Sequence, residues 1–287
     1  MSSSFATRKL IVTADDFGLS HAVNDAVETA HREGILTAAS LMVTGPASAD
    51  AILRAKRMPG LHIGLHLALV EAYPVLPPEQ LPALVDASGQ FKSNMALAGA
   101  RMFFDPAARH QLRAEIRAQF EAFAATGLRL DHLNAHKHFH MHPTIASSVF
   151  EIARAFGSPP LRVPYEQAAF INAIEPGAAG AGHRLFALGS GFLRMRARAQ
   201  GFHMPDRVIG LAWSGGMDRM RVFRAIQRLP AGITELYTHP AMDDHFAGAA
   251  AGYRYRDEFA ALIAPEILES IRKSDIRTGG YSDFCAS

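Results

Sequence analysis

Four histidines stand within seven positions of the segment DHLNAHKHFHMHP, and they are His136, His138, His140 and His142. In an extended chain the first three would share one face, and in a helix His136 and His140 would pair four residues apart. Neutral imidazoles suit zinc and other first-row metals, whereas clustered imidazolium charges repel one another. The segment therefore indicates a metal site with one or two of these histidines as ligands. The alternative is a surface histidine tract with adventitious metal affinity.

Two adjacent carboxylates, Asp15 and Asp16, follow an apolar run at residues 10–13 that predicts a buried strand. Neighbouring residues of a strand point to opposite faces, but at its end the chain turns, helped by Gly18, so both carboxylates can reach one site. One of them can bind a metal while the other acts as a base. The alternative is that one of them caps the next helix, a role that Ser20 already fits.

A third chemical signal is the pair of histidines in LHIGLHLAL, within a predicted strand at residues 61–70. His62 is interpreted as a hydrogen-bonded core residue, while His66, nearer the strand end, is the better ligand. Gly64 between them leaves room for another group to approach the backbone. One aspartate and two histidines from three strand ends form a set with open coordination positions, as in catalytic metal sites. Such a metal polarises a carbonyl and lowers the pKa of bound water, on zinc to roughly 7.

Two later strand ends also carry polar residues. In RVPYE, Arg162 can hold a carboxylate or a substrate oxygen through its planar fork, although an ordinary surface ion pair fits equally well. In TELYTHPA, His239 can donate a proton to a leaving group, and the alternative is a packed capping residue before Pro240.

The elements that position these residues alternate along the chain. Strands are predicted at residues 10–13, 36–44, 61–70, 128–136, 161–164, 207–213, 233–238 and 276–281, and helices at 20–34, 48–58, 106–126, 143–156, 218–228 and 256–273. This alternation predicts an α/β fold of parallel βαβ units. Seven or eight units without a GxGxxG loop favour a distorted, TIM-barrel-like (β/α) barrel, in which chemistry collects at the carboxyl ends of the strands. We expect one domain over residues 1–287, interrupted by irregular insertions near 71–104 and 166–206.

Composition narrows the functional class. Hydrophobic residues make up 49% and charged residues 20% of the 287 positions, which predicts a large buried core rather than disorder. With 29 Lys and Arg against 27 Asp and Glu, the net charge of +2 argues against a nucleic-acid partner. The single cysteine fits a reducing compartment. Without a signal-peptide core or an apolar stretch of about 18 residues, the sequence predicts a cytoplasmic protein without a transmembrane segment.

A segment at residues 184–204 mixes apolar side chains with arginines. This mixture is compatible with a helix that contacts lipid at the inner face of the membrane, as is the apolar stretch at residues 95–104. The more common alternative is a core-facing helix with its arginines in solvent. Peripheral membrane contact and oligomerisation both stay open from the sequence.

Taken together, the motifs TADDFG, GLH, HLNAHKHFHMHP, RVPYE and THPA, in this order from residue 10 to about residue 241, resemble the YdjC-like carbohydrate deacetylases. These are relatives of the NodB-type polysaccharide deacetylases, which have a distorted (β/α) barrel. ILTAASLMVTGPA, PVLPPE and NAHKHFHMHP are similar to the branch associated with hopanoid biosynthesis. The resemblance implies a hydrolase that removes the acetyl group from an N-acetylglucosaminyl hopanoid lipid. It also implies one divalent ion, with Zn²⁺ favoured by ligand softness and Mg²⁺ left open by the wider family.

The resemblance implies a role for each matching position. Asp15 corresponds to the catalytic base and Asp16 to the metal-binding aspartate. His66 and His136 correspond to the two metal-binding histidines, and His239 to the late histidine that acts as the acid.

Three more residues are implied around the substrate. Arg162 and Tyr165 resemble the arginine-containing strand that orients the base and lines the site, and His138 is predicted to contact substrate. The H-x-x-x-H spacing within the tract leaves open that His140 replaces His66 as a ligand, although we prefer the histidine of the third strand.

Other functions remain compatible with these residues. A deacetylase of soluble chitooligosaccharides would use the same site. A metal-dependent phosphoesterase would favour a second metal bound by His138 and His140. A non-enzymatic metal-binding protein would leave Asp15 and His239 without a role.

Overall fold

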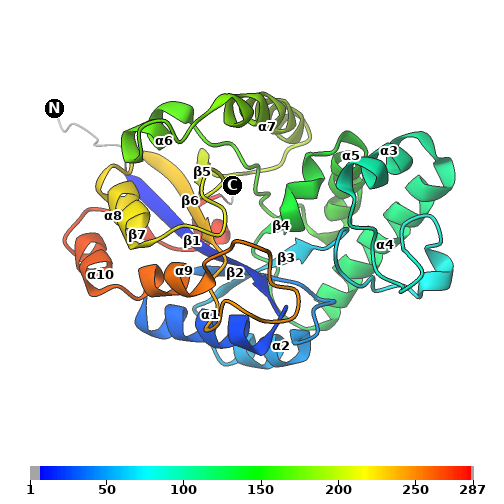
Figure 1. Cartoon of the computed structure of the whole chain (residues 1–287), viewed down its shortest axis with the longest axis horizontal. Helices are drawn as coiled ribbons and strands as arrows, with labels where there is room; N and C mark the ends of the chain where they lie inside the picture. Colours follow the sequence, from blue (N-terminus) through cyan, green and yellow to red (C-terminus); the bar gives the residue numbers. More distant parts are fainter. Residues whose placement is uncertain (1–6, 286–287) are drawn as a thin grey trace.

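A sheet of parallel strands lies at the centre of the computed structural model, which describes residues 7–285, and helices surround it (Figure 1). The strands follow the order β4-β3-β2-β1-β6-β5, and β7 pairs with β1 outside this path. Their bounds are β1 (Arg8–Phe17), β2 (Ala38–Leu41), β3 (His62–Leu67), β4 (Leu133–Ala135), β5 (Arg207–Ile209), β6 (Gly232–Thr238) and β7 (Arg277–Thr278). Because the strands are parallel, their carboxyl ends meet at one edge, where the polar motifs were expected.

The α-helices are α1 (His21–Glu33), α2 (Ser48–Lys56), α3 (Met95–Phe104), α4 (Pro106–Ala125), α5 (Pro143–Ala153), α6 (Ala168–Ile174), α7 (Ala181–Ala199), α8 (Arg219–Gln227), α9 (Tyr255–Leu262), α10 (Pro265–Arg272) and α11 (Tyr281–Phe284). Of these, α1, α2, α4, α5 and α8 begin and end close to predicted positions. Short 3₁₀ helices lie at η1 (Pro78–Gln80), η2 (His136–Met141) and η3 (Arg154–Phe156). The predicted cap is confirmed, since the Ser20 hydroxyl accepts the Val23 N–H at 3.2 Å and Gly34 follows the last turn of α1.

The core is built from strands that are apolar on both faces. In β1, Leu10, Ile11 and Val12 are fully buried, as is typical of parallel strands covered on two sides by helices. The predicted face of α4, at residues 112, 116, 120 and 123, is buried against this core.

The structure differs from the predicted closed barrel of seven or eight units. The sheet is an open half-barrel, because residues 161–164 add only one bridge, between Leu133 and Leu161, instead of a strand. Pro159, Pro160 and Pro164 lack the N–H groups that a ladder requires. The last predicted strand is reduced to β7, which pairs with the first residues of β1 and adds no new edge.

Two other expectations need correction. The predicted helix at residues 256–273 is two helices, α9 and α10, because Pro265 cannot continue the first one. The insertion near residues 71–104 ends in α3, capped by Asn94, and the insertion near 166–206 contains α6 and α7.

Candidate active site

Both carboxylates of the first strand end line one cavity. The register of β1 against β2 shifts between Ala14 and Phe17, and Asp16 takes a left-handed backbone conformation with φ 61°. Non-glycine residues rarely adopt this conformation, which costs of the order of 1–3 kcal/mol and is concentrated at functional sites. Gly18, with φ 97°, completes the turn that brings Asp15 and Asp16 to the same side.

Asp16, His66 and His136 come together from the ends of β1, β3 and β4. The Asp16 Oδ1 lies 2.9 Å from His136 Nδ1 and 3.2 Å from His66 Nε2. One potential ligand atom from each of the three residues lies within 4.8 Å of the others. A carboxylate and two imidazoles that converge in this way fit a single divalent cation.

The charges of this group fix its protonation. Burial alone would raise the pKa of Asp16, but the charges and hydrogen bonds of His136 and His66 outweigh burial and hold that pKa well below its usual value. Burial alone would lower the pKa of His66, but Asp15 and Asp16 raise it above its usual value. A cation bound at His66 would displace a proton from this imidazole, so metal binding should release a proton.

Behind Asp15 lies a buried chain of charged groups. The guanidinium of Arg162, which is fully buried, donates to Asp15 Oδ2 and, through Nε at 2.8 Å, to Glu235 Oε1. The Tyr281 hydroxyl donates to the other oxygen of Glu235, and the Tyr237 ring lies 4.7 Å from the guanidinium carbon. Burial would raise the pKa of Asp15, but Arg162 and His66 hold it far below the usual range. Arg162 is therefore not a surface ion pair, and it keeps Asp15 ionised.

His239 lines the same cavity from the end of β6. Its Nδ1 lies 3.8 Å from Glu258 Oε2, and its backbone N–H donates to the same oxygen. The rings of Tyr237 and Tyr253 contact the imidazole edge-on, with centroids 5.6 and 5.1 Å away. The capping alternative is wrong, because the next helix, α9, begins only at Tyr255.

The histidine tract is neither a strand nor an α-helix. Lys137 and His138 are left-handed, with φ 52° and 53°, and this kink separates His136 from the later histidines. His138 lines the cavity, with Nε2 3.1 Å from the Tyr237 hydroxyl. His140 donates to the backbone carbonyl of Arg162 at 2.8 Å, so the alternative in which it replaces His66 is not the arrangement observed.

Arg162 was predicted to line the site, but it lies behind Asp15 and is not among the residues that line the cavity. Tyr165 is the second predicted site residue that the structure does not bring to the cavity. Its ring packs against Arg194 of α7, 5.3 Å from the guanidinium carbon, and it is not among the residues that line the cavity. The backbone turns between Arg162 and Tyr165, since the Tyr165 N–H donates to the Val163 carbonyl at 2.6 Å.

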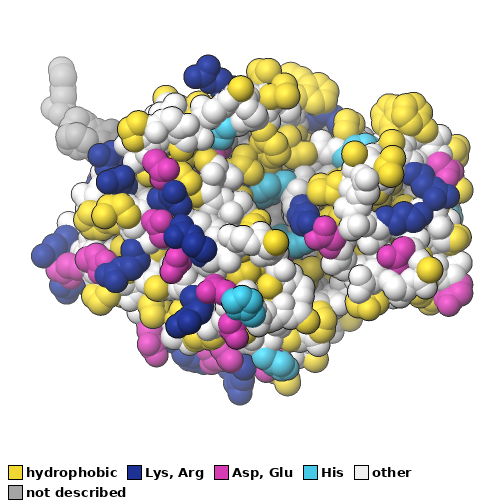
Figure 2. All heavy atoms as spheres, in the orientation of Figure 1, with side chains coloured by type: hydrophobic (Ala, Val, Ile, Leu, Met, Phe, Trp, Pro, Cys, Tyr) yellow, Lys and Arg dark blue, Asp and Glu magenta, His cyan; other side chains and the backbone are white. Residues whose placement is uncertain are grey.

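The cavity itself has a volume of about 320 Å³ and opens between loops from separate strands. In Figure 2, histidine side chains are visible in the hollow at the centre of this face, with apolar groups on both sides. The lining residues are Asp15, Asp16, His66, Glu71, His136, Lys137, His138, Phe186, Leu211, Ser214, His239, Gly248, Ala250, Tyr253 and Tyr255.

Comparison with known proteins identifies the family. A family model described as YdjC-like protein matches residues 9–273. The chain belongs to the YdjC-like family. A carbohydrate deacetylase of Vibrio vulnificus strain CMCP6 is 31% identical over 278 residues, covering 96% of each chain. One from Vibrio cholerae serotype O1, strain ATCC 39541, is 36% identical over 276 residues, which are 96% of this chain and 95% of the relative.

A solved structure shares the fold of this YdjC-like protein. The crystal structure of an Enterococcus faecalis protein proposed to act in cellobiose-phosphate cleavage superposes with a TM-score of 0.73. It is 24% identical in sequence, and the match covers 96% of this chain and 98% of that one. This similarity supports the α/β architecture.

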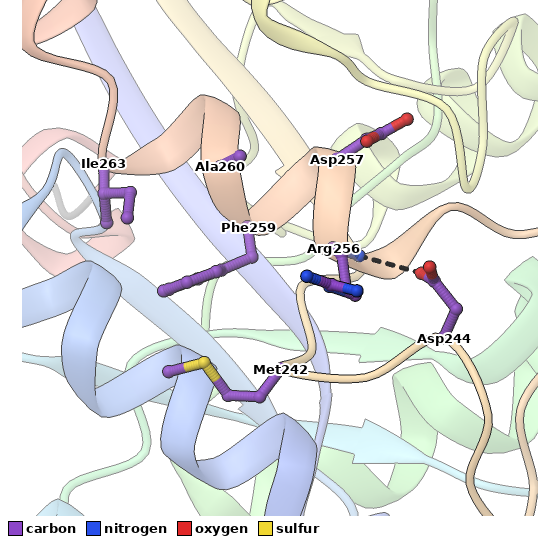
Figure 3. A pocket seen from close by; sticks show the side chains of 7 residues that line it. All are labelled: Met242, Asp244, Arg256, Asp257, Phe259, Ala260 and Ile263. Atoms are coloured by element: carbon purple, nitrogen blue, oxygen red, sulfur yellow. Dashed lines mark hydrogen bonds between the residues drawn. The ribbon is translucent and has the colours of Figure 1, made fainter.

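A larger hollow on the outer surface of the YdjC-like protein offers no comparable chemistry. It has a volume of about 470 Å³ and lies between α9 and the segment at residues 242–244 (Figure 3). Asp244 already accepts the backbone N–H of Arg256 at 3.0 Å, and Met242, Phe259 and Ile263 supply apolar walls. None of its lining residues is a histidine, and among the described residues its carboxylates Asp244 and Asp257 belong to no group of three potential metal ligands.

Three buried polar residues of the site were not predicted. Glu235 is the one charged residue of the buried strand β6, and a charged residue in such a strand could have been noticed in the sequence. Asn134 lies two residues after His132 in the histidine-rich motif, and this spacing could also have indicated a site residue. Glu258 comes from α9, and no pattern in that helix separates it from an ordinary surface glutamate.

Proposed function

We propose that this protein is a divalent-metal-dependent hydrolase that removes the N-acetyl group from an acetamido sugar. The observation that carries the proposal is the converging Asp16, His66 and His136 set beside a second carboxylate, Asp15, that is paired with Arg162 instead. One carboxylate is thereby available to hold a cation and the other to accept a proton. Relatives that are named carbohydrate deacetylases and align with 96% of the chain support this reading.

Asp16, His66 and His136 would hold the ion. Zinc is the proposed metal because two imidazoles are softer ligands than magnesium prefers. When bound, the ion supplies Lewis acidity toward the acetyl carbonyl and toward water. Amide hydrolysis joins the water oxygen to the acetyl carbon and breaks the C–N bond, giving acetate and a free sugar amine.

Two residues move the protons of this reaction. Asp15, kept ionised and oriented by Arg162, accepts a proton from the attacking water. His239 presents Nδ1 toward Glu258, so its other nitrogen, Nε2, is the one open to a substrate in the cavity. His239 then donates a proton to the departing amine, and His138 contacts the sugar from the cavity wall.

We extend the proposal to a lipid-linked substrate, the N-acetylglucosaminyl hopanoid lipid that the motif resemblance implies. Exposed apolar side chains lie on α7, whose Phe186 lines the cavity, and on α3; they are Leu185, Leu188, Phe192 and Met195 on α7 and Leu97, Phe103 and Phe104 on α3. Phe186 of α7 also lines the cavity, so the apolar surface is continuous with the site. An apolar aglycone and peripheral membrane contact fit this surface, whereas a soluble chitooligosaccharide leaves it without a partner.

The test is acetate release from a panel that runs from chitooligosaccharides to N-acetylglucosaminyl lipids, with and without a chelator. We expect activity to disappear on chelation and to return with one equivalent of zinc. Asp15→Asn should keep the metal and lower turnover by about 10²–10⁴-fold, because a positioned base contributes that much. Asp275→Asn, at the exposed pair with Arg8 near the start of β1, is the matched control and should remain fully active.

Undiminished acetate release by Asp15→Asn would remove that residue from the base role. Full activity after exhaustive removal of divalent ions would contradict the metal proposal. Binding of two ions together with phosphate-ester hydrolysis would favour the phosphoesterase alternative.

A further inference from the structure

Two charged side chains of the cavity have no role in the reaction proposed above. Asp15 and Asp16 are assigned to a proton and to an ion, and among the described residues that line the cavity the remaining carboxylate is Glu71 and the only ammonium group is that of Lys137. Glu71 follows β3 in the chain, and Lys137 lies in η2, directly after β4. The Lys137 ammonium donates to the Glu71 carboxylate, so the pair bridges the loops that follow two neighbouring strands.

The backbone of both residues is left-handed, with φ 50° at Glu71 and 52° at Lys137. Neither glutamate nor lysine favours this conformation, so each position costs the folded protein free energy. The ion pair offsets little of that cost, because the two side chains are 42% and 35% exposed and surface ion pairs contribute little to stability. Stability therefore does not account for the pair, and strain of this kind is concentrated at binding and catalytic sites.

Each member of the pair keeps hydrogen-bonding capacity after it has bonded to the other. The ammonium of Lys137 has three N–H donors and gives one of them to Glu71 Oε2. The other carboxylate oxygen, Oε1, has no hydrogen-bond partner within residues 7–285. A hydroxyl group can accept from an N–H and donate to a carboxylate at the same time. The free donors and the free acceptor therefore match one sugar hydroxyl or two adjacent ones.

The charges of the pair indicate the class of ligand. The pair has no net charge, so it offers no excess cation to a phosphate or carboxylate group and no excess anion to an amine. An apolar group placed against it would remove water from both charges without replacing the lost hydrogen bonds. A neutral ring that bears hydroxyl groups satisfies both side chains.

We propose that Glu71 and Lys137 form a subsite for the hydroxyl groups of the sugar ring that carries the acetamide. The proposal rests on the acetamido-sugar function proposed above and names two residues that determine its specificity. Lys137 follows His136 directly, and Glu71 lies four positions beyond the end of β3, the strand that carries His66. The subsite is thus built on both histidine-bearing segments, and it orients the sugar ring relative to them.

The first test is the affinity for methyl N-acetylglucosaminide, measured by NMR titration of the full chain with chelator present to prevent turnover. Lys137→Met keeps the side-chain length but removes the donors, so Kd should rise about tenfold, as expected for the loss of a hydrogen bond to a charged group. Glu71→Gln breaks the ion pair but keeps an acceptor. Because a charge-assisted hydrogen bond is about twice as strong as a neutral one, Kd should then rise only about threefold. The matched control is Lys273→Met, from the exposed pair with Glu269 at the end of α10, and it should bind the sugar like the wild type.

The second test identifies the contact itself. Kd is measured for the 3-deoxy, 4-deoxy and 6-deoxy analogues of the same glycoside, with the wild type and with Lys137→Met. The analogue that lacks the contacted hydroxyl should bind the wild type about tenfold more weakly than the parent sugar. Lys137→Met should bind that analogue and the parent sugar within about twofold of each other, because the two changes remove the same hydrogen bond. Additive losses for all three analogues would overturn the proposal.

Kinetics separate a substrate contact from a structural role of the pair. A contact made equally in the bound substrate and in the transition state should raise KM about tenfold in Lys137→Met and leave kcat within about twofold. Zinc affinity should stay at the wild-type value. If Lys137 only held His136 in place, zinc affinity and kcat would both fall, and this result would contradict the proposal.

Three further outcomes are decisive. Equal losses of sugar affinity in Lys137→Met and Glu71→Gln would show that only the ion pair matters, and they would overturn the subsite. The absence of saturable sugar binding by the wild type would do the same. Sugar binding that follows the expected pattern without any acetate release would refute the proposed hydrolase function and leave the subsite supported.

Discussion

Histidines a few positions apart in one tract have different charged neighbours. His136 faces the Asp16 carboxylate, while His138 and His140 lie near the Arg162 guanidinium. Burial first, and then the charge of Arg162, lowers the pKa of His138 well below its usual value and that of His140 to about 4. Residue type therefore marks this segment as a candidate site, and the surroundings decide which ring is available to a cation.

The neutral state of His140 predicts a loss of stability in acid. Its pKa is about 4 in the folded protein and about 6.5 when unfolded, so between these values the unfolded chain binds more protons. Stability from this residue is therefore full above pH 6.5 and falls as the pH drops toward 4, by about 2 kcal/mol between pH 7 and pH 5. His140→Gln retains a donor for the Arg162 carbonyl but does not titrate, so its urea-unfolding free energy should depend less steeply on pH.

The comparison of His140→Gln with the wild type needs two controls. Chelator is present throughout, so that His66, whose raised pKa acts in the opposite sense, contributes equally in every protein. His245→Gln changes a histidine whose side chain is 96% exposed, and its pH dependence should match the wild type. A His140→Gln slope equal to that of the wild type would show that His140 does not carry this acid sensitivity.

Among the elements, β3 depends on one glycine. Gly64 lies opposite the His132 ring, and a Cβ atom there would overlap all three nearest ring atoms at 2.3–2.5 Å. We predict that Gly64→Ala lowers the free energy of unfolding by about 1–3 kcal/mol, the usual cost of overpacking a core. Urea denaturation measures this change.

Substitution of a second glycine should change the free energy of unfolding in the opposite direction, and it serves as the control. Gly191 lies within α7, and a Cβ atom there would meet nothing within 4 Å. Gly191→Ala should raise the free energy of unfolding by up to about 1 kcal/mol, because alanine favours a helix. Equal effects of the two substitutions would contradict the packing argument for β3.

The sequence predicts elements better than it predicts their closure. Apolar runs placed the strands, and Ser20 and Gly34 marked both ends of α1. Closing the sheet would require backbone N–H groups near residues 159–164 that three prolines there lack. A strand was nevertheless predicted at residues 161–164, where the structure has only one bridge.

For the site, likewise, the sequence predicts the ligand motifs but not the backbone conformation or the contacts made by packing. The three strand-end motifs that carry Asp16, His66 and His136 were readable because parallel strands end at one edge. The kink at Lys137 and His138 was not, since left-handed conformations of these residue types leave no pattern in the sequence. Glu258 reaches His239 from a helix that begins sixteen positions later, and only the packed fold shows that contact.

At the scale of the whole molecule, the cavity opens between apolar helices. In Figure 2, apolar groups gather over α7 and near α3, on either side of the hollow. No helix in residues 7–285 is long and apolar enough to cross a bilayer. The helix α7 carries four arginines and no acidic residue, a charge that the proposed contact with an anionic membrane would require.

This surface predicts reversible binding to anionic vesicles. Leu188 and Phe192 are 73% and 52% exposed on α7, so Leu188→Glu with Phe192→Glu should leave the core intact. Removing two apolar contacts of about 1.5–3 kcal/mol each and adding two negative charges should lower recovery with phosphatidylglycerol-rich vesicles at least tenfold in a flotation assay. Leu53→Glu, 62% exposed on α2 at the opposite edge of the molecule (Figure 1), is the control and should float like the wild type.

If binding delivers a lipid-linked sugar to the cavity, the Leu188→Glu and Phe192→Glu double variant loses activity on vesicle-embedded substrate and keeps it on a soluble acetamido sugar. Recovery of the wild type in the unbound fraction would show instead that the apolar surface has another occupant.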